Sequence, residues 1–187
     1  PDTGAVTVAT QRLQPSNGKE NGGSSGKASG TTIVTSGTAE TYFEAINKLN
    51  EKTTDENFLG FCGDIIIGED AARYLMEDFI RYFKHTPNIP LTANLYITTG
   101  KAADLLQSNG IMQSTITINN VSEKISAAAV AGVTVETRII DFIEAASIDG
   151  IDPIAARIIN ENIGNEDLKD QEVKINELIR VSGISVF

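Results

Sequence analysis

Several residue types are scarce in this sequence. The chain has 187 residues, with no tryptophan, one cysteine and one histidine. The single cysteine, Cys62, excludes a disulfide within the chain and a metal site built from several cysteines. No apolar stretch approaches the ~20 residues that a helix needs to cross a bilayer, so we expect no membrane-spanning helix.

Positive charge is also in short supply. Lys and Arg number 15 against 25 Asp and Glu, which leaves a net charge of −10. An acidic surface disfavours binding to nucleic acid or to an anionic membrane through charge. Hydrophobic residues make up 41% of the chain, enough for a sizeable core, so the composition is that of a globular domain.

The two ends of the sequence indicate a piece of a longer protein. The chain begins with Pro1 instead of Met, a strand pattern starts at Ala5, and residues 183–187 end within an apolar run. We therefore expect a longer parent, and the missing signal peptide or lipid-anchor cysteine says nothing about that parent.

Residues 58–106 organise the chain, because they predict strand, helix, strand and helix in turn. Residues 64–67 are a short apolar run closed by Gly68, typical of a strand covered on both faces. One helix should follow, with an acidic first turn and an apolar stripe of period 3.6. The next strand is expected over 94–99 and the next helix over 101–106, so the two strands should be parallel. The stripe consists of Ala72, Leu75, Met76, Phe79, Ile80 and Phe83.

The segment before this region predicts a hairpin and a helix. Residues 5–13 and 31–35 should be antiparallel strands, because both are rich in β-branched residues. The connecting Gly/Ser-rich loop, residues 15–30, is expected to be mobile. Thr38 is placed to cap a helix over 39–50.

The segment after it completes the expected fold. Asn120 is placed to start a helix, and Pro153 marks the following strand as an edge strand. These elements together predict an α+β (mixed α/β) protein, with a central mixed sheet of about five to seven strands and helices packed on it. The remaining elements are helices over residues 121–131 and 134–146 and strands over residues 155–159 and 173–181.

Patterns for nucleotide or calcium binding are incomplete. The Gly-Lys pair at 26–27 is followed by Ala28 and a strand, and the pair at 100–101 lacks the upstream Gly of a phosphate-binding loop. The acidic runs at 149–152 and 165–167 lack the spacing, central Gly and terminal Glu of a calcium loop. We expect no cofactor and no metal.

Cys62 and His85 are the candidates for a nucleophile and a base. A Cys-His enzyme also needs an orienting group and an oxyanion hole. Cys62 precedes an apolar strand, where a buried cysteine acts as a small hydrophobe, and His85 follows a helix end, where a cation favours the dipole. A structural role is therefore favoured, and the alternative is a small α/β enzyme or ligand-binding domain that uses Cys62 and His85.

A series of short motifs resembles one known family. The motifs are Leu-Gly at 59–60, Ile-Ile-Ile-Gly-Glu-Asp-Ala at 65–71, Pro-Asn-Ile at 87–89 and Gly-Lys-Ala-Ala-Asp-Leu-Leu at 100–106. In this order they are similar to the N-terminal domain of the C subunit of bacterial spore germinant receptors, the Ger(x)C lipoprotein family. The chain departs from that pattern where the family's Gly-His becomes Gly-Phe-Cys at 60–62, and where its Arg-Asp becomes His-Thr at 85–86.

The resemblance implies a function and partners. The chain would be the N-terminal domain, residues 1–187, of a longer Ger(x)C-like protein, with 173–187 leading toward the next domain. It would be a non-enzymatic subunit of a nutrient germinant receptor, lipid-anchored on the outer face of the spore inner membrane. Its partners would be the A and B membrane subunits, contacted through His85, Asn88 and Lys101, with a small-molecule germinant met only indirectly. An unrelated interaction module of a secreted or phage-tail protein is a further alternative.

Overall fold

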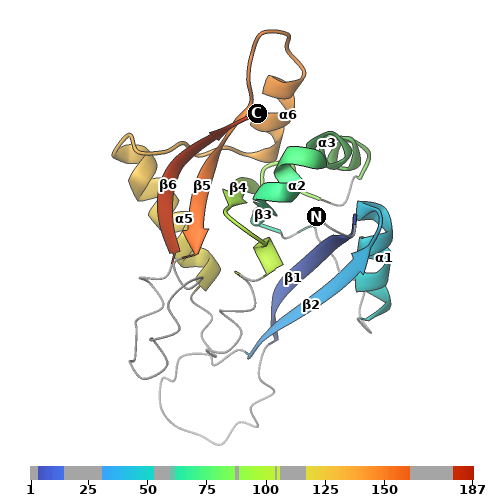
Figure 1. Ribbon diagram of the computed structural model, residues 1–187. Coiled ribbons are helices and arrows are strands. Elements are labelled where there is room, and N and C mark those ends of the chain that lie inside the picture. Colours follow the sequence, from blue (N-terminus) through green and yellow to red (C-terminus); the bar gives the residue numbers. More distant parts are fainter. Residues whose placement is uncertain are drawn as a thin grey trace, which may run out of the picture.

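Two β-sheets and five helices make up the described part of the chain, which confirms the α+β class (Figure 1). The computed structural model describes residues 4–14, 31–52, 60, 62–86, 89–103, 105, 117–160 and 179–187. The predicted Gly/Ser-rich loop at 15–30 lies outside these residues. Among the described helices, none is long and apolar enough to cross a membrane.

The first sheet is a hairpin of β1 (Val6–Gln14) and β2 (Thr31–Ala39), which pair antiparallel as predicted. Helix α1 (Tyr42–Glu51) packs on this hairpin. Thr38 does not cap the helix, because β2 continues through it, and its hydroxyl meets that of Thr7 at 3.0 Å. Thr41 is the N-cap instead, and its Oγ1 accepts a hydrogen bond from the Glu44 amide at 3.3 Å.

The second sheet has four strands, in the order β3-β4-β5-β6. They are β3 (Asp64–Gly68), β4 (Asn94–Thr98), β5 (Ile154–Asn160) and β6 (Ile179–Val186). The predicted parallel pairing of β3 with β4 is confirmed, β5 is parallel to β4, and β6 runs antiparallel to β5. This sheet is smaller than the five to seven strands expected, because β1 and β2 pair with each other in a sheet of their own.

Helices cover both faces of the four-stranded sheet. One face carries α2 (Glu69–Tyr74), α3 (Met76–His85) and α6 (Ile139–Ala146), and the other carries α5 (Thr117–Val130). The strand side chains alternate between the two cores, as period 2 requires. The first core contains Ile67, Ala72, Phe79, Phe83, Ile89, Ala93, Leu95, Ile97, Ile139, Phe142 and Ala155. The second contains Tyr96, Leu105, Val121, Ile125, Ala156 and Ile158.

Tyr42 joins the hairpin and α1 to the larger sheet. Its ring lies edge-on to those of Phe79 and Tyr82 of α3, with centroids 5.9 and 4.7 Å away. Burial raises the pKa of the Tyr42 hydroxyl above its ordinary value. The hairpin unit is therefore anchored on α3 by one aromatic cluster.

The predicted helix after Gly68 is broken into two. Leu75, with φ −125° and ψ 10°, separates α2 from α3. Each half begins with an acidic pair, Glu69–Asp70 in α2 and Glu77–Asp78 in α3, where negative charge favours a helix start. The apolar stripe nevertheless stays against one core, because Ala72, Phe79 and Phe83 are all buried there.

Two other helices begin at residues other than those expected. The helix expected from Thr134 begins only at Ile139, because the Thr137 carbonyl accepts from the Leu95 amide at 2.8 Å and the Ile139 amide donates to Ala93 at 3.0 Å. Helix α5 starts at Thr117, so Asn120 lies inside it and is not its cap.

Strand β5 is interior, not an edge strand, because it pairs with both β4 and β6. Pro153 precedes the strand, so its missing N–H costs no bond of the sheet, and its carbonyl accepts from the Phe187 amide at 3.0 Å. Of the helix expected over 101–106, Ala102, Ala103 and Leu105 are described and are helical.

Candidate functional site

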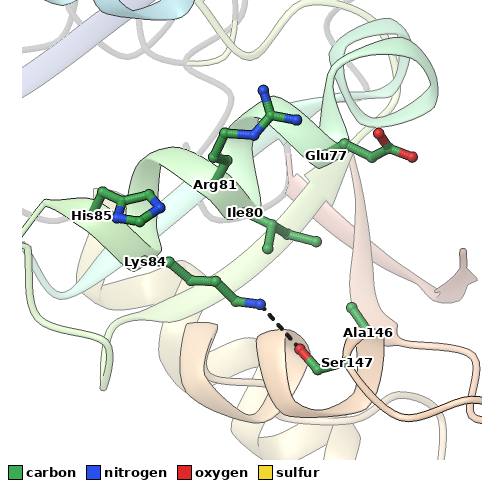
Figure 2. Close-up of a pocket in the computed structure, with 7 residues that line it drawn as sticks. All are labelled: Glu77, Ile80, Arg81, Lys84, His85, Ala146 and Ser147. Atoms are coloured by element: carbon green, nitrogen blue, oxygen red, sulfur yellow. Dashed lines mark hydrogen bonds between the residues drawn. The ribbon is translucent and has the colours of Figure 1, made fainter.

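His85, one of the predicted contact residues, lies in an open groove between α3 and the end of α6. The groove has a volume of about 310 Å³. It is lined by Glu77, Ile80, Arg81, Lys84, His85, Ala146 and Ser147 (Figure 2). Of the apolar residues, Ile80 packs against the first core and Ala146 is exposed, and the charged residues all come from α3.

Lys84 spans the groove. Its Nζ donates to the Ser147 hydroxyl at 3.1 Å (Figure 2). That hydroxyl in turn donates to the Ile143 carbonyl at 2.7 Å. Ser147 is the C-cap of α6, while Lys84 and His85 lie in the last turn of α3. Two helix C-termini, each with partial negative charge, therefore meet at this group of basic side chains.

Arg81 and Glu77 complete the charged rim. Arg81 projects away from α6 (Figure 2). Its Nη1 lies 3.4 Å from Asp78 Oδ1 in an exposed pair. Glu77 lies at the end of the groove away from His85, eight residues earlier on the same helix, or about 12 Å along its axis. Lys84 and His85 therefore lie at one end of the groove and Glu77 at the other, with Arg81 midway, four residues from both Glu77 and His85.

The other predicted contact residues do not join this groove. Lys101 is exposed and follows the carboxyl end of β4, where Gly100 takes a φ of 77°. His85 ends the helix that leads into the amino end of the same strand, so the two residues belong to opposite ends of β4. Asn88 lies outside the described residues.

Cys62 does not form a catalytic pair with His85. Its half-buried Sγ lies 3.3 Å from the carbonyl oxygen of Asp64, just before β3, and it does not line the groove. Burial raises the pKa of the Cys62 thiol, which favours the unreactive protonated form. Within the described residues, no hydrogen bond joins Cys62 to His85.

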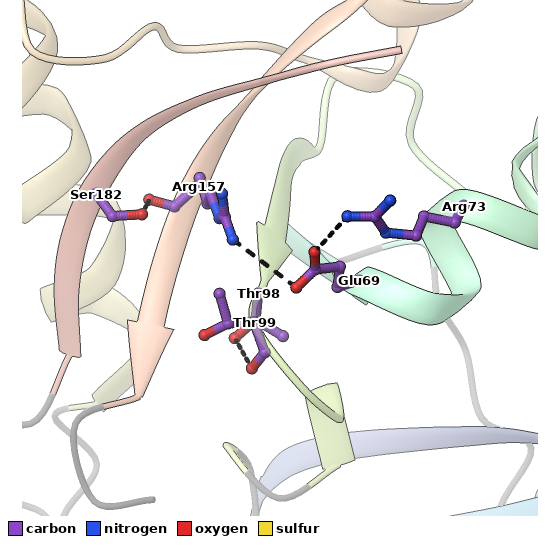
Figure 3. A network of polar contacts seen from close by, with 6 residues as sticks. All are labelled: Glu69, Arg73, Thr98, Thr99, Arg157 and Ser182. Atoms are coloured by element: carbon purple, nitrogen blue, oxygen red, sulfur yellow. Dashed lines mark hydrogen bonds and ion pairs between the residues drawn. The ribbon is translucent and has the colours of Figure 1, made fainter. Parts of the chain in front are cut away.

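An ion-pair network crosses the carboxyl ends of the parallel strands. Glu69 accepts from Arg73 at 2.7 Å and lies 3.8 Å from Arg157 of β5 (Figure 3). The hydrogen bond from Arg73 lowers the pKa of the Glu69 carboxyl. The i, i+4 spacing of Glu69 and Arg73 on one helix was visible in the sequence. Arg157 lies 88 residues after Glu69, and nothing in the sequence indicated that the two side chains would meet. Glu69 pairs with both arginines, so the network ties α2 to β5.

A second polar cluster lies at the amino ends of β3 and β4. Asp64 Oδ1 accepts from the Tyr96 hydroxyl at 3.0 Å and from Asn94 Nδ2 at 3.1 Å. Burial, followed by the charge of Asp64, raises the pKa of Tyr96. The cluster stabilises the buried Tyr96 hydroxyl, and in the described parts of the chain no group of His, Cys, Asp and Glu is arranged to hold a metal ion.

Comparison with known proteins bears on this arrangement. The sequence profile of one family, described as the spore germination protein N-terminal domain, matches residues 1–159. The chain belongs to this family. No curated protein and no solved structure matches it.

The match to the germination-domain family confirms the resemblance to the germinant receptor C subunit. It runs from the N-terminal hairpin almost to the end of β5 and includes every residue of the α3/α6 groove. Strand β6 lies beyond it. The site residues that sequence reasoning missed are Arg81 and Lys84, whose i, i+3 spacing on α3 was visible, and Ser147, which only the fold brings to them.

Proposed function

We propose that this spore germination domain is part of the C subunit of a nutrient germinant receptor, and that it acts by contacting other proteins. The observation that carries the proposal is the family match over residues 1–159. The subunit would relay nutrient recognition toward ion and dipicolinic acid release, working with the membrane-embedded A and B subunits.

A non-enzymatic role accords with the side chains of the described residues. The candidate nucleophile Cys62 is half-buried with a raised pKa, and His85 lies on the groove rim. Catalysis by a cysteine needs a thiolate and a base within hydrogen-bond reach of it. The exposed His85 and Lys101 remain our candidates for partner contact, together with Asn88.

The proposal includes the setting of the domain. Residues 1–187 would form the N-terminal domain of a longer protein, with 173–187 leading toward the next domain. A lipid anchor at the N-terminus of that protein would hold it on the outer face of the spore inner membrane. Within the segment 173–187, β6 pairs with β5 of this domain.

The test is deletion of the gene in the bacterium that encodes it, followed by measurement of dipicolinic acid release from purified spores exposed to nutrients. We expect release to be lost and to return when the full-length gene is restored. Total dipicolinic acid, released by boiling, should be unchanged, which separates a germination defect from a sporulation defect. Normal release from the deletion spores with every nutrient mixture that germinates the parent strain would contradict the proposal.

A further inference from the structure

The α3/α6 groove combines an apolar floor with a basic rim. Ile80 and Ala146 supply aliphatic surface. Lys84 and His85 lie in the last turn of α3, and Arg81 lies one turn before His85. Figure 2 shows His85 and Glu77 at opposite ends of the groove, Lys84 directed toward Ser147, and Arg81 between them and directed away from α6. A surface of this kind suits a partner segment that carries both an aliphatic side chain and carboxylates.

The cations of the rim are open to an incoming carboxylate. The hydrogen bond of Lys84 within the described structure goes to a neutral hydroxyl, that of Ser147. The ion pair between Arg81 and Asp78 is long, at 3.4 Å, and the Arg81 and Asp78 side chains are 69% and 61% exposed. Such an exposed pair contributes little, so exchanging Asp78 for a partner's carboxylate would cost little.

The charge of the whole chain decides between two kinds of anionic partner, a lipid bilayer and an acidic protein segment. A net charge of −10 repels an extended anionic surface such as a lipid bilayer. A short peptide segment meets mainly the local charges, because salt screens interactions beyond about 8–10 Å. The basic groove of this acidic protein therefore fits an acidic protein segment better than a membrane.

We propose that the α3/α6 groove binds an acidic segment of a partner protein. An aliphatic side chain would lie against Ile80 and Ala146, one carboxylate at Lys84 in the groove, and another at Arg81 on the side of α3 that faces away from α6. Glu77 sets the direction of the segment, because it repels a carboxylate at its own end of the groove. The inference rests on the proposed function, since it names the contact surface and the partner chemistry of a domain that works through protein contacts.

The first experiment is an NMR titration of the ¹⁵N-labelled chain with two synthetic peptides. One is a short amphipathic peptide of leucine and glutamate, and the other has lysine in place of each glutamate. We expect the acidic peptide to shift the amide signals of Ile80, Lys84 and Ser147, and the basic peptide to leave them in place. Equal shifts with both peptides, or no groove shifts with the acidic one, would overturn the proposal.

Charge-reversal variants test the rim directly. Lys84→Glu and Arg81→Glu should each weaken binding of the acidic peptide about tenfold, whereas Lys48→Glu on α1 makes the same change in net charge and should leave it unaltered. If a charge-reversal variant disturbs the fold, the neutral variants Arg81→Gln and Lys84→Gln test the same contacts. Equal affinity across all these variants would contradict the assignment, as would groove shifts produced by phosphatidylglycerol vesicles but not by the acidic peptide.

Germination assays separate this inference from the proposed function. Spores with Lys84→Glu in the full-length protein should release dipicolinic acid more slowly, and spores with Lys48→Glu should behave as the parent. If deletion abolishes release but Lys84→Glu spores release dipicolinic acid normally, the proposed binding at the groove is wrong and the proposed function is unaffected. Peptide binding at the groove with no deletion defect refutes the proposed function alone.

Discussion

Gly37 is the position at which one added methyl group should disturb the N-terminal unit most. It lies in β2 under α1, where a Cβ would overlap the Ala45 carbonyl oxygen and come within 2.6 Å of the Leu49 amide nitrogen. Both are backbone atoms of α1, so no side-chain rotation relieves the contact. The helix must move away by roughly 1 Å, which loosens a buried face that includes Ala45 and Leu49.

Overpacking of this kind costs about 1–3 kcal/mol. We expect Gly37→Ala to cost about 3 kcal/mol, because the whole helix is displaced and not one flexible side chain. At about 2–4 °C per kcal/mol for a chain of this size, the melting temperature should fall by about 6–12 °C.

The assay is thermal and urea unfolding followed by circular dichroism. Gly63→Ala is the matched control, because a Cβ at Gly63 meets no atom within 4 Å, and it should change stability by less than about 0.5 kcal/mol. Equal melting temperatures for Gly37→Ala and the parent chain would refute the close packing of α1 on β2.

Three further predictions concern single polar groups. Tyr96→Phe removes the hydrogen bond to Asp64 and should lower the free energy of unfolding, measured in urea, by about 1.5–3 kcal/mol. Tyr82→Phe is the control and should be nearly neutral, because the Tyr82 hydroxyl has no hydrogen-bond partner among the described residues. Equal losses of stability in the two variants would contradict the Asp64 contact. The hydrogen bond from Arg138 lowers the pKa of Asp141, so the stability that this carboxylate adds is present above its unfolded pKa and is lost as the pH falls through its folded pKa. The stability difference between the parent and Asp141→Asn should therefore shrink below about pH 4, and a constant difference would be inconsistent with this contact. Cys62→Ser should leave nutrient germination unchanged, and loss of germination with an intact fold would support the catalytic alternative. Because the pKa of the Cys62 thiol is raised, a disulfide reagent should label it more slowly at neutral pH than it labels a free cysteine.

Local periodicity predicted the elements around the centre of the chain well. The apolar run before Gly68 and the alternating pattern of the hairpin each indicate which side chains face a core. The parallel pairing of β3 and β4 was predictable because a helix between two strands almost always produces it. The break at Leu75 was not, since the apolar stripe continues through it without a Gly or a Pro.

The candidate site was less accessible to sequence reasoning. His85 was selected as a contact residue, and the structure places it on the groove rim. Its groove neighbour Ser147 lies 62 residues further along the chain, and nothing local connects them. Cys62 and His85 drew attention because each is unique in the chain, but uniqueness carries no information about where a side chain lies.

By itself, the sequence determined the α+β class, the strand-helix-strand order of the centre and the family to which the chain belongs. These depend on hydrophobic period and on the order of short motifs, both of which are local properties. Tertiary structure decided that the hairpin forms a sheet of its own, that β5 is interior, and that α3 and α6 line one open groove. Such features depend on which distant segments pair, and the free energy of pairing comes from burial and hydrogen bonds that exist only once the chain has folded.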